Sequence, residues 1–177
     1  PRQAQLRDPV PQLQRQVLLR RQPARLRRAH RITHMNGLII RILARNPSTE
    51  GAPIGFDDVS ERPRNFQWRN DEPSTVFFVQ AVDKGLGRSK SEYRDAAYAV
   101  NPLTQDAPVE LFKTRKRFNG IIWGGKEHAI VMESMFADRK TRMNLYNPAT
   151  GKFDSLYERS SNDAYSDIGT PMTKKNQ

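Results

Sequence analysis

The tetrapeptides Asn46-Pro47-Ser48-Thr49, Asn101-Pro102-Leu103-Thr104 and Asn147-Pro148-Ala149-Thr150 follow one pattern, Asn-Pro-x-Thr, and each comes after a run of apolar and β-forming residues. The second motif begins 55 residues after the first, and the third begins 46 residues after the second. A turn that recurs at intervals of roughly 40 to 50 residues, with four short strands per interval, is typical of β-propeller blades. The three motifs therefore predict a repeated, all-β architecture.

The residues around the second and third motifs align with one another segment by segment. In each copy a short first strand precedes an unbroken apolar run, which is typical of a central strand with both faces covered. The fixed φ and missing N–H of proline end the third strand at the motif, and a fourth strand follows. The expected strands are Phe66–Trp68, Val76–Val82, Ala96–Val100 and Val109–Thr114 in one copy, and Ile121–Trp123, Ala129–Met135, Arg142–Tyr146 and Phe153–Glu158 in the next.

The copy around the first motif is truncated. Only Leu38–Leu43, the motif itself and a short strand over Ala52–Phe56 are legible. We therefore expect an all-β chain whose residues 36–171 form a partial β-propeller of about two and a half four-stranded antiparallel blades. Each blade buries its faces against its neighbours, and a ring normally closes with four to eight of them. We expect the chain to be a piece of a larger protein, with a polar end at residues 172–177.

The formal net charge of +11 is concentrated in the N-terminal quarter. Before Pro47 there are eleven arginines, one aspartate, no lysine and no aromatic residue, whereas the remainder carries 19 basic and 18 acidic residues and all fifteen aromatic residues. We expect residues 1–35 to be a non-globular, disordered or irregular tail, because a charge-rich stretch without aromatic residues buries little surface. The propeller portion is nearly neutral.

Two further interpretations of this stretch stay open. The first is a basic arm that neutralises phosphates, although no aromatic residue or glycine is interleaved for base stacking. The second, which we favour, is translation in the wrong reading frame, because a stretch rich in Arg, Gln, Leu and Pro gives way abruptly to well-patterned strands. The coding DNA distinguishes the second from the others. The core of the basic arm would be Arg20, Arg21, Arg25, Arg27 and Arg28.

Motifs for chemistry are sparse. The chain has no cysteine, and no run approaches the 18 apolar residues of a membrane-spanning helix. His30 and His34 lack a third ligand, and His128 stands alone, so we expect no metal site and no cofactor. Gly85-Leu86-Gly87 departs from the phosphate-binding GxxxxGK[ST] pattern and fits a loop between strands better. There is no Gly-x-Ser-x-Gly elbow and no recognisable triad, so no catalytic residue is expected.

From Ile54 onward the sequence resembles the prolyl oligopeptidase family of serine peptidases, in its glutamyl endopeptidase-like branch. The resemblance covers about residues 50 to 171, and Ile168 stands where proline is expected. The family's catalytic Ser, Asp and His lie in a C-terminal α/β-hydrolase domain that this chain lacks, so none is carried over. The segments that carry the resemblance are Pro63-Arg64-Asn65-Phe66-Gln67-Trp68-Arg69, Tyr93-Arg94-Asp95-Ala96, and Arg117-Phe118 followed by Gly120 and Trp123.

The resemblance implies a supporting function: a propeller that gates the access of peptides to a missing hydrolase domain. The implied partners are a peptide substrate, the missing blades and that domain, with no membrane and no nucleic acid. The sequence gives no compartment, whereas the resemblance would fit a periplasmic or secreted bacterial protein or a plastid protein. A free-standing propeller that binds a protein or a glycan is the alternative.

Several arginines lie near the expected strand ends, and Arg69 and Arg117 are the candidates for attracting acidic substrate side chains. The competing interpretation is that these arginines pair with nearby carboxylates at the blade rims. Trp68 and Trp123 recur at one place in the repeat, which favours packing between blades over a stacking platform for a ligand. The full set of strand-end arginines is Arg64, Arg69, Arg94, Arg115, Arg117 and Arg142, with Asp71, Glu92, Asp95 and Asp138 as possible partners.

Overall fold

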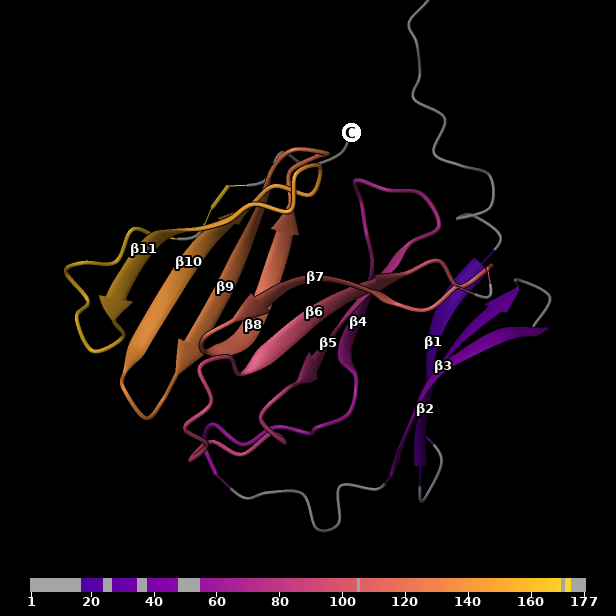
Figure 1. The fold of residues 1–177 in the computed structure, drawn as a ribbon, viewed down its shortest axis with the longest axis horizontal. Coiled ribbons are helices and arrows are strands. Elements are labelled where there is room, and N and C mark those ends of the chain that lie inside the picture. The colour runs from indigo at the N-terminus through magenta and orange to yellow at the C-terminus, as the bar shows by residue number, and fades with distance from the viewer. Residues whose placement is uncertain are drawn as a thin grey trace, which may run out of the picture.

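A computed structural model of the chain describes residues 17–23, 27–34, 38–47, 55–104, 106–169 and 171–172. Within them the fold is all-β, without a helix, and its strands form three antiparallel sheets in the orders β1-β2-β3, β4-β5-β6-β7 and β11-β10-β9-β8 (Figure 1). The strands are β1 Val17–Pro23, β2 Arg27–His34, β3 Ile39–Pro47, β4 Arg64–Trp68, β5 Val76–Ala81, β6 Asp95–Val100, β7 Val109–Thr114, β8 Arg117–Trp123, β9 Ala129–Met135, β10 Lys140–Tyr146 and β11 Phe153–Ser160.

The predicted strands of the two complete copies are confirmed. Strands β7 and β9 have the predicted bounds, and β4, β5, β6, β8, β10 and β11 differ from the predictions by a few residues at one end. In each of the two four-stranded sheets the strands follow one another as an antiparallel meander. We refer to β1–β3, β4–β7 and β8–β11 as the first, second and third sheets.

The second and third Asn-Pro motifs form equivalent turns directly after the third strand of their sheets. Asn101 Oδ1 accepts a hydrogen bond from the backbone N–H of Leu103 at 3.0 Å. Asn147 Oδ1 accepts hydrogen bonds from the N–H groups of Ala149 at 2.9 Å and Thr150 at 3.1 Å. These asparagine side chains replace the ladder partners that the proline interrupts. The repeat therefore has a local physical cause.

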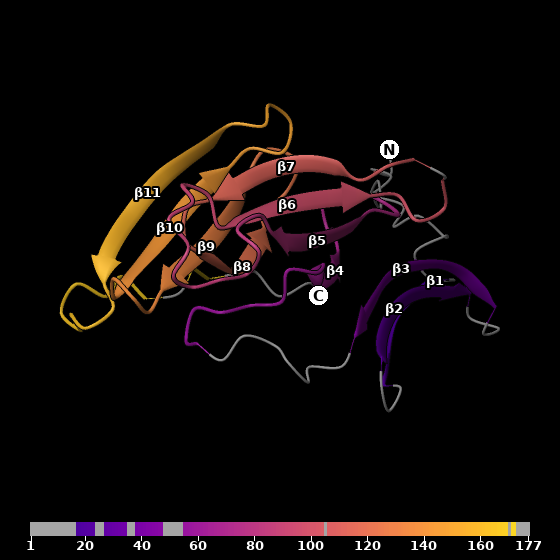
Figure 2. The same ribbon diagram turned by 60° about the horizontal axis from the view of Figure 1, so that its bottom comes forward.

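The three sheets stack face to face, and the second sheet lies in the middle (Figures 1 and 2). On one face of β5, Val76 and Phe78 pack with Ile32 of the first sheet. On the other face, Phe77 and Val79 pack with Phe118 and residues of the third sheet. Adjacent residues of a strand point to opposite faces, so a strand with both faces covered requires apolar residues at successive positions, as from Val76 to Val79.

The repeated tryptophans lie in the two inter-sheet cores, as predicted. Trp68 packs against the core between the first and second sheets, and Trp123 against the core between the second and third. The Trp123 ring meets the Phe77 ring edge-on, with centroids 5.6 Å apart. Such edge-to-face contacts are favoured geometries for buried aromatic rings.

The prediction of an irregular N-terminal tail is corrected by β1 and β2, which lie within residues 17–34. The prediction weighed the charged side chains, but a strand ladder is formed by backbone N–H and C=O groups. β2 pairs with β3 from Arg27 opposite Pro47 to Thr33 opposite Ile39. In addition, Ile32 is completely buried against the second sheet and anchors the pair. The out-of-frame interpretation stays a prediction.

Two details around the first Asn-Pro motif also differ from expectation. Asn46 and Pro47 form the end of β3 instead of following it. The strand expected over Ala52–Phe56 falls partly outside the described residues, and Gly55 and Phe56 lie in a turn. The first copy is therefore a three-stranded sheet in which β3 ends at the Asn-Pro motif and pairs with β2, which pairs with β1.

Replacing Phe77 with alanine tests the central packing. The Phe77 ring is completely buried and contacts the rings of Phe112, Phe118 and Trp123. We expect Phe77→Ala to lower the free energy of unfolding by about 3–5 kcal/mol, because it removes apolar burial and leaves a cavity. Urea unfolding followed by tryptophan fluorescence measures the loss. Val109→Ala, at a residue with 64% exposure, is the control, and a loss no larger than the control's would contradict the doubly covered sheet.

Candidate functional site

Arg117, one of the two candidate substrate residues, lies buried at the start of β8. Its guanidinium donates to both carboxylate oxygens of Asp83, through Nη1 at 2.8 Å and Nη2 at 2.9 Å. Its Nε donates to the carbonyl oxygen of Asp57 at 2.8 Å. Nη1 also lies 3.3 Å from Asp95. Arg117 therefore joins the third sheet to the end of the second sheet through a bidentate ion pair.

Two further arginines complete this cluster. Arg94 binds Asp83 at 3.0 Å, and Arg64 binds Asp95 at 2.5 Å. Asp95 also accepts the backbone N–H of Phe118 at 2.8 Å, where β8 begins. Burial raises the pKa of Asp83, but hydrogen bonds from Arg117 and Arg94 outweigh it and hold this pKa below its ordinary value. The ionised carboxylate is therefore the stable form in the folded chain.

A loop that precedes β4 fastens the same end of the two sheets. The carboxylate of Asp57 accepts the N–H groups of Phe136 at 2.6 Å and Ala137 at 2.8 Å, in the turn between β9 and β10. The neighbouring Asp58 accepts the N–H of Gly87 at 2.6 Å, in the loop between β5 and β6. Sequence reasoning missed both aspartates as structural residues, because their partners are backbone groups with no residue signature.

Arg69, the second candidate, lies directly after β4 and is also buried. It forms a bidentate pair with Asp71, through Nη2 at 2.6 Å and Nε at 3.0 Å, and binds Glu72 at 2.8 Å. Its guanidinium lies 4.7 Å from the centre of the Trp123 ring. Burial lowers the pKa of Arg69, but the pairing with Asp71 outweighs it and raises this pKa above its ordinary value.

The structure does not bring the two candidate arginines together into one open site. Each is engaged by carboxylates of its own chain, as the competing interpretation expected. Arg115 pairs with Glu92 at 3.0 Å, and Arg142 pairs with Glu158. Hydrogen bonds from Lys140 and Arg142 lower the pKa of Glu158 to about 2. The attraction of acidic substrates by Arg69 and Arg117 stays a prediction for a longer protein.

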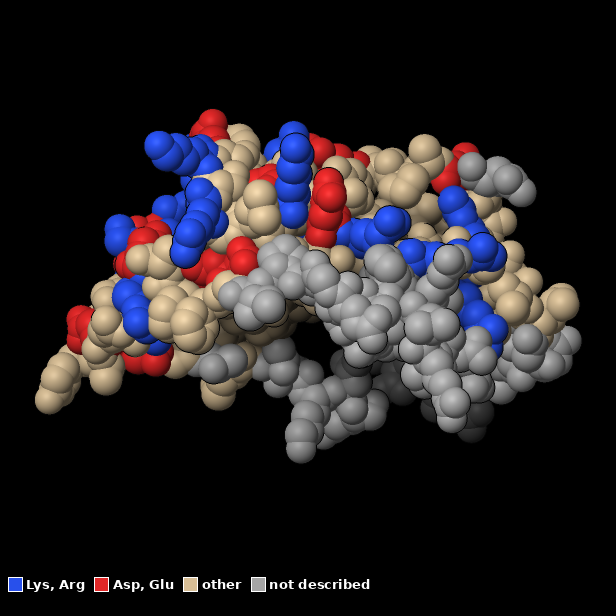
Figure 3. All heavy atoms as spheres, turned by 90° about the horizontal axis from the view of Figure 1, so that it is seen from below, with Lys and Arg blue, Asp and Glu red and all other residues tan. Residues whose placement is uncertain are grey.

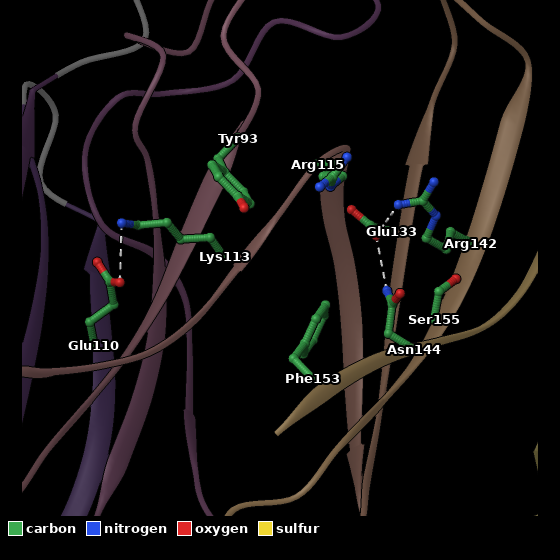
Figure 4. Close-up of a pocket in the computed structure, with 9 residues that line it drawn as sticks. All are labelled: Tyr93, Glu110, Lys113, Arg115, Glu133, Arg142, Asn144, Phe153 and Ser155. Carbon is green, nitrogen blue, oxygen red and sulfur yellow. Dashed lines mark hydrogen bonds and ion pairs between the residues drawn. The ribbon is translucent and has the colours of Figure 1, made fainter. Parts of the chain in front are cut away.

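A polar groove of about 470 Å³ opens between the second and third sheets (Figure 4). The buried Glu133 carboxylate forms part of its lining, accepting a hydrogen bond from Asn144 Nδ2 at 2.9 Å, and Lys113 pairs with Glu110 at 3.2 Å. Its charged groups are thus paired within the chain. The groove contains no histidine to activate Ser155. Its lining residues are Tyr93, Glu110, Lys113, Arg115, Glu133, Arg142, Asn144, Phe153 and Ser155.

The histidines singled out in the sequence lie apart. His30 stacks on the Phe66 ring with centroids 4.4 Å apart, His128 is exposed before β9, and the side chain of His34 lies outside the described residues. Among the described residues, no group of three or more His, Cys, Asp or Glu side chains is arranged to hold a metal ion. That portion also contains no helix long and apolar enough to cross a membrane.

Two curated proteins are similar to this chain, and both are named "Probable glutamyl endopeptidase, chloroplastic". The protein from Oryza sativa subsp. japonica is 33% identical over 145 residues, which is 80% of this chain and 16% of the relative. The protein from Arabidopsis thaliana is 33% identical over 144 residues, which is 79% of this chain and 15% of the relative. The chain thus spans about one sixth of the length of these relatives, and the likeness supports a peptidase-related origin.

No protein-family model matches the chain. No solved structure matches it either.

Replacing Asp83 with asparagine tests the buried ion pairs. Asp83→Asn keeps the shape of the side chain but removes the charged partner of Arg94 and the bidentate partner of Arg117, so we expect the free energy of unfolding to fall by about 3–5 kcal/mol at pH 7. Because the folded pKa of Asp83 lies below the unfolded value of about 4, its contribution is present above pH ~4 and disappears as the pH falls through the folded pKa. The gap between wild type and variant should therefore narrow in acid.

Urea unfolding at several pH values measures this gap. Asp154→Asn is the control, because Asp154 is half-exposed in a surface pair with Lys152. We expect this control to change stability by less than about 1 kcal/mol. A gap for Asp83→Asn that stays constant from neutral to acidic pH would contradict the stabilising role of the ionised carboxylate.

Proposed function

We propose that this chain is a non-catalytic part of the β-propeller of a longer serine peptidase, and that the propeller gates the access of peptides to an α/β-hydrolase domain. Two observations support the proposal. Three antiparallel sheets stack face to face in chain order, and the chain is similar to about one sixth of two proteins named as glutamyl endopeptidases. The first of these observations carries the architectural part of the proposal.

Equivalent positions of the repeat lie on the same face of the second and third sheets, as the strand registers indicate. In the second sheet, Val79 lies opposite Ala97, and in the third sheet Met132 lies opposite Met143. Aligned by the repeat, Phe77 and Val79 correspond to Ile130 and Met132. The same repeat positions thus occur on the same face of each sheet. Like neighbours stacked in one direction are the arrangement of propeller blades.

The outer face of the third sheet extends this pattern. Phe77 and Val79 are completely buried because the third sheet covers them, whereas Ile130 and Met132 are only partly buried. A further four-stranded sheet would cover Ile130 and Met132, together with Leu145 and Met143, in the same way. Such a neighbour would account for the apolar character of this partly buried face, because apolar surface exposed to water is unfavourable.

The catalytic step would take place outside this chain. In the proposed complete protein, a serine nucleophile with its histidine and acid would transfer the acyl group of the peptide. The paired arginines and the groove of this chain offer no group for that step. The contribution of the stacked sheets would be steric: a narrow passage admits an extended peptide and excludes folded proteins.

The coding sequence downstream of codon 177 tests the proposal. We expect further strands of the same repeat, then a Gly-x-Ser-x-Gly elbow with an aspartate and a histidine after it. The complete protein should cleave a short glutamate-containing peptide and spare a folded protein with accessible glutamates, whereas the 177-residue chain should cleave neither. A stop codon after further repeats, without the elbow, would contradict the peptidase function and favour a binding module.

The substrate role of the arginines is tested in the same complete enzyme. Arg69→Gln and Arg117→Gln each remove a cation that the chain already pairs internally. We expect the ratio of kcat/KM for acidic and neutral peptides to stay within about twofold, because the paired charges contribute little to the field that the substrate meets. Thermal unfolding of each variant serves as the control for folding. A tenfold fall in this ratio, in a folded variant, would establish the substrate role instead.

A further inference from the structure

The loop between β5 and β6 contains three exposed cations. From Val82 to Lys90 the residues alternate between exposed and at least partly buried positions, and Lys84, Arg88 and Lys90 are exposed. In the part of the chain that the structure describes, no carboxylate forms an ion pair with any of these three. Leu86 lies between Lys84 and Arg88 in the sequence, and its side chain is 46% exposed. The exposed side chains of this loop therefore combine three cations with aliphatic groups.

The backbone of this loop is held in place. Gly85 N–H donates to Asp83 Oδ1 at 3.0 Å, and the carbonyl oxygen of Gly85 accepts the N–H of Val59 at 2.9 Å. Gly87 N–H donates to Asp58. Gly85 has φ of 73° and lies so close to Val59 that a Cβ would fall 2.0 Å from the Val59 carbonyl oxygen. The cations thus project from a fixed base.

Two acidic residues near the cations in the sequence, Asp83 and Glu92, are already engaged. Asp83 is neutralised by Arg94 and Arg117, and Glu92 pairs with Arg115. Figure 3 views the molecule from this end and shows Lys and Arg side chains among Asp and Glu. Asp83 and Glu92 thus have partners, and no described carboxylate, the neighbouring exposed Glu61 included, forms an ion pair with the three loop cations, which are therefore available to an external anionic group.

Exposed apolar side chains lie beside the basic loop. Phe56 is 85% exposed and stacks on Phe136, with ring centroids 4.2 Å apart. The guanidinium of Arg139 lies 3.6 Å from the centre of the Phe136 ring. Phe56 lies in the loop before β4, and this loop contacts the loop between β5 and β6. The contact is so close that a Cβ built at Gly87 would lie 2.9 Å from Asp57 Cβ. Basic and apolar groups thus share one end of the stacked sheets.

We propose that this surface, formed by Lys84, Leu86, Arg88 and Lys90 with Phe56 beside it, docks an acidic protein segment that also carries apolar side chains. A phosphate cradle does not fit, because the backbone N–H groups of Gly85, Leu86, Gly87 and Ser89 are all used within the chain. What remains is a set of separated side-chain cations around aliphatic and aromatic groups. That combination suits carboxylates and apolar residues distributed along a polypeptide. The inference does not rest on the proposed peptidase function.

Fluorescence anisotropy with a labelled peptide of glutamate and leucine residues tests the docking surface. We expect binding to the 177-residue chain that weakens with salt, and weaker binding of the counterpart peptide with glutamine in place of glutamate. Charge reversal in Lys84→Glu/Arg88→Glu/Lys90→Glu should weaken binding about tenfold or more, because each surface contact changes from attraction to repulsion. Leu86→Ser should weaken binding of the leucine-containing peptide while leaving the net charge unchanged.

The matched control is Lys113→Glu/Lys126→Glu/Lys152→Glu, which makes the same change in net charge at exposed lysines elsewhere. The arginine-rich N-terminal stretch contributes equally to both triple variants, so their difference reports the loop alone. Circular dichroism checks that both variants are folded. Equal weakening in the two triple variants would overturn the site. Tighter binding of a single-stranded oligonucleotide of equal charge, lost in the loop variant alone, would overturn the assignment to a protein segment.

Discussion

The burial of the second sheet on both faces is the constraint on which the rest of this structure depends. Alternate residues of β5 point into two different cores, and all of them except Gln80 are apolar. Neither core exists without a neighbouring sheet to supply its other half. At ~25 cal/mol per Å² of apolar surface, this burial is the main favourable contribution to stacking the sheets. The first and third sheets are held in place because each covers one apolar face of the second sheet.

The buried ion pairs act on the same arrangement, but they fix geometry more than they add stability. Asp95 begins β6 of the second sheet and Asp83 lies in the loop between β5 and β6, whereas Arg117 begins the third sheet. Desolvation offsets much of the Coulomb attraction in such pairs, so replacing one partner costs more than the pair contributes. Bidentate geometry nevertheless admits a narrow range of positions. The ends of the two sheets are therefore joined at a defined place.

The two proposed functions involve two different parts of the structure. The apolar outer face of the third sheet favours a further sheet, which is the basis for proposing a longer propeller. The loop end carries cations on a fastened backbone, which is the basis for proposing a docking surface. Both follow from described side chains that the observed packing leaves partly buried or exposed. The arginines first suspected of binding substrate differ, because the packing has already given them partners.

The sequence alone determined the all-β class, the strands of the second and third sheets and the Asn-Pro turns, because alternation, proline and asparagine act locally through the backbone. It also indicated that Trp68 and Trp123 pack between sheets. Only the tertiary structure decided that residues 17–23 and 27–34 form strands, that Asp57 binds a distant turn, and that Asp83 binds two arginines. These depend on contacts between residues far apart in the chain, and residue type does not specify such partners. The pattern of apolar residues predicts the strand in which a residue lies. The partner of a buried charged residue depends instead on which distant segment packs against it.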